Sequence, residues 1–290
     1  LVGSEMCIRD SPPIIGVWYW CTDQYIVQRV LSAKNVSEAR RGTIFAGYLK
    51  LLPIFMFFIP GLIAYAMTKT GQLNYGSSDQ VFPTLVRELL PSGIRGLVAG
   101  GLLAALMSSL SSVFNSCSTL FTMDIYKKLY PETNEKKLVF VGRIATGIVV
   151  LSGILWIPFI KVVSGAGLYT YLQSVQAYIA PPIASVFLLG LFWSRSNASG
   201  ALAALVGGFM AGMIRLGLEI TNSTLSVDGI WYQIADLNFL YFAIFSFLTC
   251  VIVLITVSML TPPPNLEKIN GLTYDTSKKN IAEADHLKSD

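Results

Sequence analysis

AALMSSLSSVFNSCSTLFTMDIY, residues 104–126, combines the apolar content of a membrane-spanning helix with an unusual number of side-chain oxygens. At about 100° per residue, the polar side chains fall on one half of a helix and the large apolar ones on the other. The stretch therefore predicts a membrane helix whose oxygen-rich half faces protein or solute. The nine polar side chains are Ser108, Ser109, Ser111, Ser112, Asn115, Ser116, Ser118, Thr119 and Thr122.

The rest of the chain has the same character. Of its 290 residues, 53% are hydrophobic and only 13% are charged, whereas soluble domains carry about 25% charged residues. No apolar run alternates with the period of two that a barrel strand shows. The composition therefore predicts an all-α integral membrane protein with about seven transmembrane helices. Runs of about 20 apolar residues, enough to cross a bilayer, lie at 13–28, 43–68, 93–122, 138–162, 168–193, 199–218 and 238–261.

The positive charges are distributed unevenly between alternate loops. Fourteen Lys and Arg residues lie in one set, formed by 29–42, 123–143, 193–197 and the tail 262–290. Five lie in the other set, 69–95, 161–167 and 215–237. By the positive-inside rule the first set, with the polar tail, is predicted to be cytoplasmic.

Both ends of the chain are expected to be incomplete or non-native. Residues 1–12 are polar and lack the charged and apolar regions of a signal peptide, and we interpret them as a non-native, adapter-derived segment. The tail 262–290 stops without an obvious closing element. We therefore expect a fragment of a longer protein.

The sequence disfavours several functional classes. It contains no nucleotide-binding motif, metal-ligand cluster or nucleophile–base pair, and its four cysteines show no paired spacing. We expect no enzymatic activity, no organic cofactor and no nucleic-acid partner. The lipid bilayer is the expected environment.

The carbonyl of Ala105 and the hydroxyls of Ser108 and Ser109 form a candidate cation site. A helical carbonyl keeps a spare lone pair, and hydroxyls three and four residues later stand close to it. Three converging oxygens suit a small hard cation. Serine pairs also serve simply for close helix packing, so the spacing alone leaves both interpretations open.

Two further polar residues lie within apolar runs. Lys50 is about 12 Å into the run 43–68. Its side chain either extends to the lipid headgroups or belongs to a functional site within the membrane. Gln173 lies one turn after Tyr169 in the run 168–193 and either bonds a neighbouring helix or faces a polar solute.

Several longer motifs carry a family resemblance. The chain resembles the sodium/solute symporter family, and most closely its sodium/glucose cotransporter branch, from about residue 13 to residue 270. The resemblance suggests a bacterial member of the family, located in the inner membrane. The motifs are YWCTDQYIVQR (19–29), SAKNVSEA (32–39), YLKL (48–51), LMSSLSSVFNSCSTLFTMDIY (106–126) and YLQSVQAYIAPPIASVFLLGLFW (171–193).

The resemblance implies a leucine-transporter-like inverted-repeat fold. Residues 13–195 would form the second five-helix repeat and 196–261 two peripheral helices, and a missing N-terminal repeat would be required for function. The resemblance also assigns sodium to Ala105, Ser108 and Ser109.

The resemblance further implies a solute site. Gln173 would bind a hydroxyl, Lys50 would donate a hydrogen bond, and Tyr19 would close the pocket between the walls of Trp20 and Tyr169. The implied function is sodium-coupled symport, by alternating access, of a hexose such as glucose or galactose.

Alternatives remain for the substrate and for the class of protein. Gly16 replaces a substrate-contacting asparagine that a galactose transporter of the family has, which leaves the exact hexose open. The alternatives are symport of myo-inositol or another polyol, and a membrane sensor or anchor without transport.

Overall fold

The computed structural model describes residues 13–163, 168–221, 229–274 and 276–277. Within these ranges the regular elements are all helices, and six runs are long and apolar enough to cross a membrane. The predicted all-α membrane class is therefore confirmed. The spans are Val36–Lys69, Ser92–Leu129, Glu135–Pro158, Thr170–Phe192, Ala198–Ile220 and Phe239–Leu260.

The expected first span, 13–28, is not one continuous helix. A helix from residue 13 ends in the π-helical turn η1 (Trp18–Thr22), and α2 (Gln24–Leu31) then begins. Between them Asp23 is extended, with φ −73° and ψ 114°. Aspartate favours such non-helical positions because its side chain competes for backbone hydrogen bonds. The expected seven spans are thus corrected to six in the described part of the chain. The segment 1–12, expected to be non-native, lies outside the described residues.

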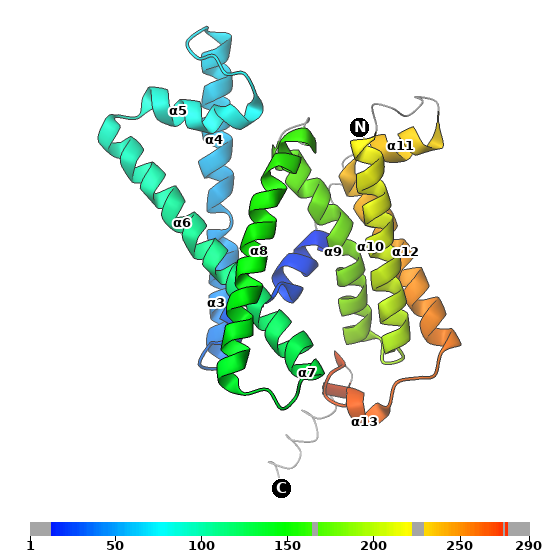
Figure 1. Cartoon of the computed structure of the whole chain (residues 1–290). Coiled ribbons are helices and arrows are strands. Elements are labelled where there is room, and N and C mark those ends of the chain that lie inside the picture. Colours follow the sequence, from blue (N-terminus) through cyan, green and yellow to red (C-terminus); the bar gives the residue numbers. More distant parts are fainter. Residues whose placement is uncertain (1–12, 164–167, 222–228, 275, 278–290) are drawn as a thin grey trace. The chain divides into compact units, whose positions relative to one another are not determined.

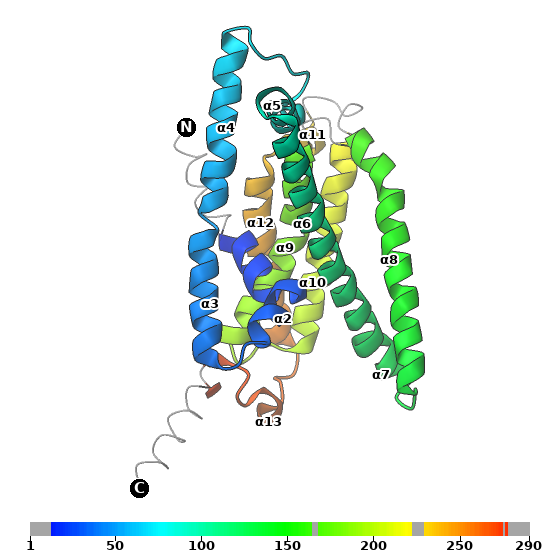
Figure 2. The ribbon, with the colours of Figure 1, turned by 90° about the vertical axis from the view of Figure 1, so that its left-hand side faces the viewer.

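Contacts divide the chain into two compact units, Gln24–Thr170 and the combination of Leu1–Asp23 with Tyr171–Asp290. In the first unit, α3 (Val36–Leu49) and α4 (Leu52–Lys69) follow one another as a single long span (Figure 2). The Asn35 side chain caps α3 by accepting a hydrogen bond from the Glu38 N–H at 2.8 Å.

A long crossing pair completes the first unit. The oxygen-rich stretch lies on α6 (Ser92–Thr119), which continues through the π-helical turn η3 (Leu120–Tyr126) and α7 (Lys127–Leu129). Helix α8 (Glu135–Val163) crosses it (Figure 1). The long apolar helix predicted around residues 93–122 is therefore confirmed.

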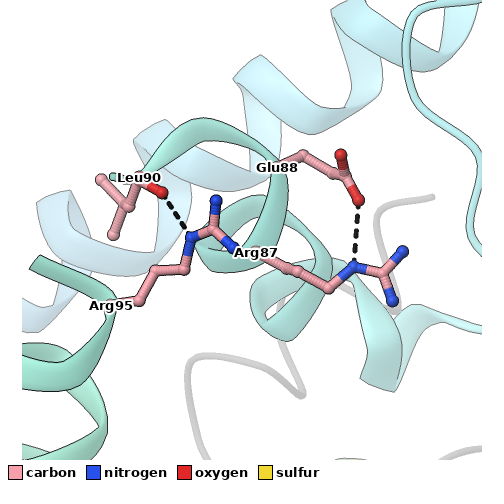
Figure 3. Close-up of polar contacts among 4 residues, drawn as sticks. All are labelled: Arg87, Glu88, Leu90 and Arg95. Atoms are coloured by element: carbon pink, nitrogen blue, oxygen red, sulfur yellow. Dashed lines mark hydrogen bonds and ion pairs between the residues drawn. The ribbon is translucent and has the colours of Figure 1, made fainter. Parts of the chain in front are cut away.

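The connection between α4 and α6 is itself helical. It contains a 3₁₀ turn, η2 (Ser78–Gln80), and α5 (Val81–Leu89), whose Leu85 is buried against α4. Figure 3 shows how α6 is joined to it: the Arg95 Nε donates to the Leu90 carbonyl at 2.5 Å. The guanidinium thus binds a carbonyl at the end of α5 that has no partner within the helix.

The second unit is built around three long helices. Helices α10 and α12 lie side by side (Figure 1). Small residues on α10 recur every four positions where it meets α12 and α9, so the helices approach closely there. The unit comprises η1, most of α9 (Leu168–Phe192), α10 (Ala198–Ile220), α11 (Ile230–Asp236), α12 (Phe239–Leu260) and α13 (Leu266–Ile269).

Helix α10 is longer than the run 199–218 that the sequence suggested. It continues to Ile220, so Arg215 is not a loop charge but part of the helix, with only 3% of its surface exposed. The expected loop 215–237 is wrong for its first residues, because neighbouring helices bury and bind this charge instead of leaving it to water.

Replacing Gly208 with alanine is expected to destabilise the second unit. A Cβ there would lie 2.4 Å from the Pro182 Cγ and 2.6 Å from the Cys250 Sγ, and overpacking of this kind costs about 1–3 kcal/mol. Thermal unfolding of the purified protein should show a lower Tm. Gly207→Ala is the matched control, because a Cβ at Gly207 has nothing within 4 Å. Equal Tm values for the two variants would contradict the close packing.

Candidate cation and solute sites

The three candidate sodium ligands lie together on one exposed part of α6. This part is regular α-helix, so Ala105, Ser108 and Ser109 keep the spacing that brings a carbonyl and two hydroxyls to one side. Thr119, by contrast, donates its hydroxyl to the carbonyl four residues earlier, at 2.8 Å. Among the described residues, neither serine hydroxyl makes such a bond. Their oxygens are therefore available to a ligand, and sodium binding by them stays a prediction.

A hydrogen-bonded relay reaches this region from α2. The Arg29 Nη2 donates to the Ser112 Oγ at 3.0 Å, and that hydroxyl donates to the Ser108 carbonyl at 3.0 Å. The relay engages the Ser108 backbone but not the Ser108 or Ser109 side chains. Sequence reasoning missed Arg29, although it ends the motif at 19–29. Its contact with Ser112 holds α2 against α6 one turn from the candidate ligands.

Among the remaining polar side chains of α6, two pack inside the protein, as small hydroxyl residues commonly do in membrane helices. Ser118 donates to the Gly142 carbonyl of α8 at 2.8 Å, and Ser116 is 5% exposed. Ser112 binds Arg29 instead, and Thr119 is exposed. The polar half of the helix thus contains buried or helix-bonding side chains, Ser116 and Ser118, and exposed ones, the serine pair and Thr119.

Two candidate solute ligands belong to the same unit as the cation ligands. Lys50 lies where α3 meets α4, inside the span Val36–Lys69, and is exposed. Its predicted position within a span is therefore confirmed. Tyr169 lies in the first turn of α9, and its side chain is outside the described structure.

The other candidate solute ligands belong to the second unit. Tyr19 and Trp20 pack edge to face in η1, with ring centroids 5.5 Å apart and planes at 89°; Tyr19 is half-buried and Trp20 is 39% exposed. Gln173 is half-buried on α9. The structure brings the two aromatic rings together, whereas the convergence of all five residues on one solute stays a prediction.

Comparison with known proteins places the chain among transporters. Residues 8–208 match the model of the sodium:solute symporter family. The chain is 40% identical over 288 residues to the sodium/myo-inositol cotransporter 2 of Mus musculus, covering 94% of this chain and 43% of that protein.

Two other relatives are similarly close. Identity is 42% over 271 residues to the sodium/glucose cotransporter 1 of Ovis aries, covering 86% of this chain and 40% of that protein. It is 40% over 283 residues to the sodium/myo-inositol cotransporter of Homo sapiens, covering 92% and 39%. The chain spans less than half of the length of these curated relatives.

Proposed function

Because this chain belongs to the sodium:solute symporter family, we propose that it is part of a sodium-coupled symporter whose solute is a cyclic polyol such as myo-inositol. Membership of a transporter family means that the chain is not an enzyme. The observation that carries the proposal is the 40% identity, over 94% of the chain, to a sodium/myo-inositol cotransporter. A hexose, favoured by the sequence motifs, becomes the second candidate, supported by the 42% identity to a sodium/glucose cotransporter.

The proposed architecture is the leucine-transporter-like inverted repeat, with residues 13–195 as the second repeat and 196–261 as peripheral helices. The break at Asp23 supports it, since discontinuous helices at the solute site are a recurring feature of transporters with inverted repeats. In this proposal a preceding segment supplies the first repeat, which is required for transport. The short coverage of the relatives agrees with this. The multi-pass chain would have a cytoplasmic tail in a bacterial inner membrane.

In the proposed mechanism, sodium binds the Ala105 carbonyl and the hydroxyls of Ser108 and Ser109. Hard oxygen ligands replace part of the ion's hydration shell. Bound sodium stabilises an outward-open arrangement, and rocking of the repeats then exposes ion and solute to the cytoplasm. The membrane potential contributes about 2.3 kcal/mol per charge per 100 mV.

In the proposed solute site, side chains match the two surfaces of a cyclic polyol. The ring faces are apolar and suit the aromatic rings of Tyr19, Trp20 and Tyr169, whereas the hydroxyls around the rim suit Gln173 and Lys50. myo-Inositol carries a hydroxyl on every ring carbon and has no ring oxygen. An amide, which both donates and accepts, can bind two such neighbouring hydroxyls.

Solute uptake by the full-length protein tests the proposal. Radiolabelled myo-inositol should enter proteoliposomes in sodium and not when choline replaces sodium, with empty liposomes as the control. Unlabelled myo-inositol should compete at lower concentration than glucose. Uptake that is indifferent to the exchange would exclude sodium coupling. Stronger competition by glucose would establish the hexose as the solute.

A further inference from the structure

A network of polar and aromatic contacts, with Tyr178 and Arg215 buried at its centre, joins three helices of the second unit. It consists of Tyr178 on α9, Arg215 and Glu219 on α10, and Phe242 on α12. None of these residues was singled out from the sequence. The only signal was an arginine and a glutamate four residues apart at the end of an apolar run, a spacing that places both on one face of a helix.

Arg215 is the charged centre of this network. Its Nη2 donates to the Leu237 carbonyl, in the link between α11 and α12. Its guanidinium carbon lies 5.6 Å from the centre of the Phe242 ring, within range of a cation–π contact. A buried charge is expensive unless such contacts hold it. Arg215 therefore constrains α10 relative to the start of α12.

Tyr178 connects α9 to both partners. Its hydroxyl donates to the Glu219 Oε2 at 2.5 Å, and its ring meets the Phe242 ring edge to face, with centroids 5.3 Å apart. The ring is only 2% exposed. A Cβ on Gly212 would lie 2.9 Å from the Tyr178 carbonyl oxygen, so the backbones of α9 and α10 nearly touch here. These contacts together fix the rotation of α9 about its axis.

The rotation of α9 determines where Gln173 points. Gln173 precedes Tyr178 by five residues, which separates the two side chains by about 140° around the helix and about 7.5 Å along it. When Tyr178 faces α10 and α12, the Gln173 amide therefore faces largely away from them. A rotation of α9 by a few tens of degrees would move this amide by several ångströms, because it extends well beyond the helix axis.

We propose that Tyr178, Glu219 and Arg215 are positioning residues, which hold α9 at the rotation that presents Gln173 to the solute. The inference rests on the proposed function, since it assumes that Gln173 binds the solute. It assigns these three residues a role in solute affinity, although Arg215 and Glu219 lie on α10, a helix expected to be peripheral, and Tyr178 packs against it. It also predicts that they affect the solute and not the sodium site.

The decisive variant is Tyr178→Phe in the full-length protein, because it removes one oxygen and keeps the ring packing. We expect the KM for solute uptake to rise about 5- to 10-fold, because only part of the free energy of the lost hydrogen bond to a charged group is passed on to solute binding through Gln173. Vmax per molecule in the membrane should change less than about twofold, because the substitution weakens only solute binding. The sodium concentration for half-maximal uptake should likewise change less than about twofold. Tyr65→Phe, at an exposed tyrosine of α4, is the matched control and should leave all three quantities unchanged.

The other two positions provide a test of charge. Glu219→Gln keeps a hydrogen-bond acceptor and should raise KM less than Glu219→Ala. Arg215→Lys should retain more solute affinity than Arg215→Gln, because the lysine keeps the positive charge. If a variant at Arg215 does not reach the membrane, Tyr178→Phe still decides the question.

A double-mutant cycle separates positioning from a merely structural role. In a Gln173→Ala background the substitution Tyr178→Phe should have little further effect on uptake at low solute concentration, because the side chain that it positions is gone. Additive losses of uptake from the two substitutions would overturn the inference. So would a Tyr178→Phe variant that is less abundant in the membrane but has an unchanged KM. Absence of sodium-dependent uptake by the unsubstituted protein would instead overturn the proposed function.

Discussion

Replacing Ser109 with alanine is expected to raise the sodium concentration for half-maximal uptake by roughly 10- to 100-fold. The substitution removes one of the three oxygens proposed to bind sodium, and a bond between a neutral group and a charge is worth about 1.5–3 kcal/mol. Ser108→Ala should act in the same direction. The measurement is the sodium dependence of solute uptake by the full-length protein, with choline as the replacement cation.

Thr119→Ala is the matched control on the same helix. Its hydroxyl is exposed and, within the described part of the chain, bonds the Asn115 carbonyl alone, at 2.8 Å. This variant should keep the sodium dependence of the unsubstituted protein. Unchanged sodium dependence in Ser109→Ala would show that the serine pair only packs, which is the alternative that the spacing left open.

Replacing Gln173 with alanine is expected to raise the KM for the solute by roughly 10- to 100-fold. The amide can donate and accept, so its loss removes about two hydrogen bonds, each worth about 0.5–1.5 kcal/mol. The sodium concentration for half-maximal uptake should change far less, because the proposed sodium ligands lie on α6. Initial rates over a range of solute concentrations measure both effects.

Gln233→Ala serves as its control, since Gln233 is an exposed amide in the same unit, on α11. It should leave the KM unchanged. If Gln173→Ala, like the control, kept the KM of the unsubstituted protein, Gln173 would be excluded from the solute site. The basis for a positioning role of Tyr178 would then be removed.

Much of the candidate cation site could be predicted from sequence because it is local. Ala105, Ser108 and Ser109 lie within two turns of one helix, and their relation follows from helical periodicity once the helix is expected. The position of Lys50 inside a long apolar span is of the same kind. The contact between Arg29 and Ser112 is different, since it joins residues 83 positions apart that no periodicity relates.

The break in the first expected span could not be predicted from its apolar content. Hydrophobicity reports that a segment can lie in a membrane, and it does not report whether every backbone hydrogen bond continues along one helix. At Asp23 the backbone leaves the helical conformation after the π-helical turn at Trp18–Thr22. Such a break is stable only when surrounding protein or water satisfies the freed backbone groups.

By itself, the sequence determined the class of the protein, the spans after residue 36 and the local spacing of the sodium candidates, because these depend on composition and on helical geometry over a few turns. Only the tertiary structure decided the helix break at Asp23, the burial of Arg215 and the network that orients α9. These depend on what neighbouring helices offer to a polar group, and a charge that looks like a loop residue in sequence is buried once the Leu237 carbonyl and the Phe242 ring contact it.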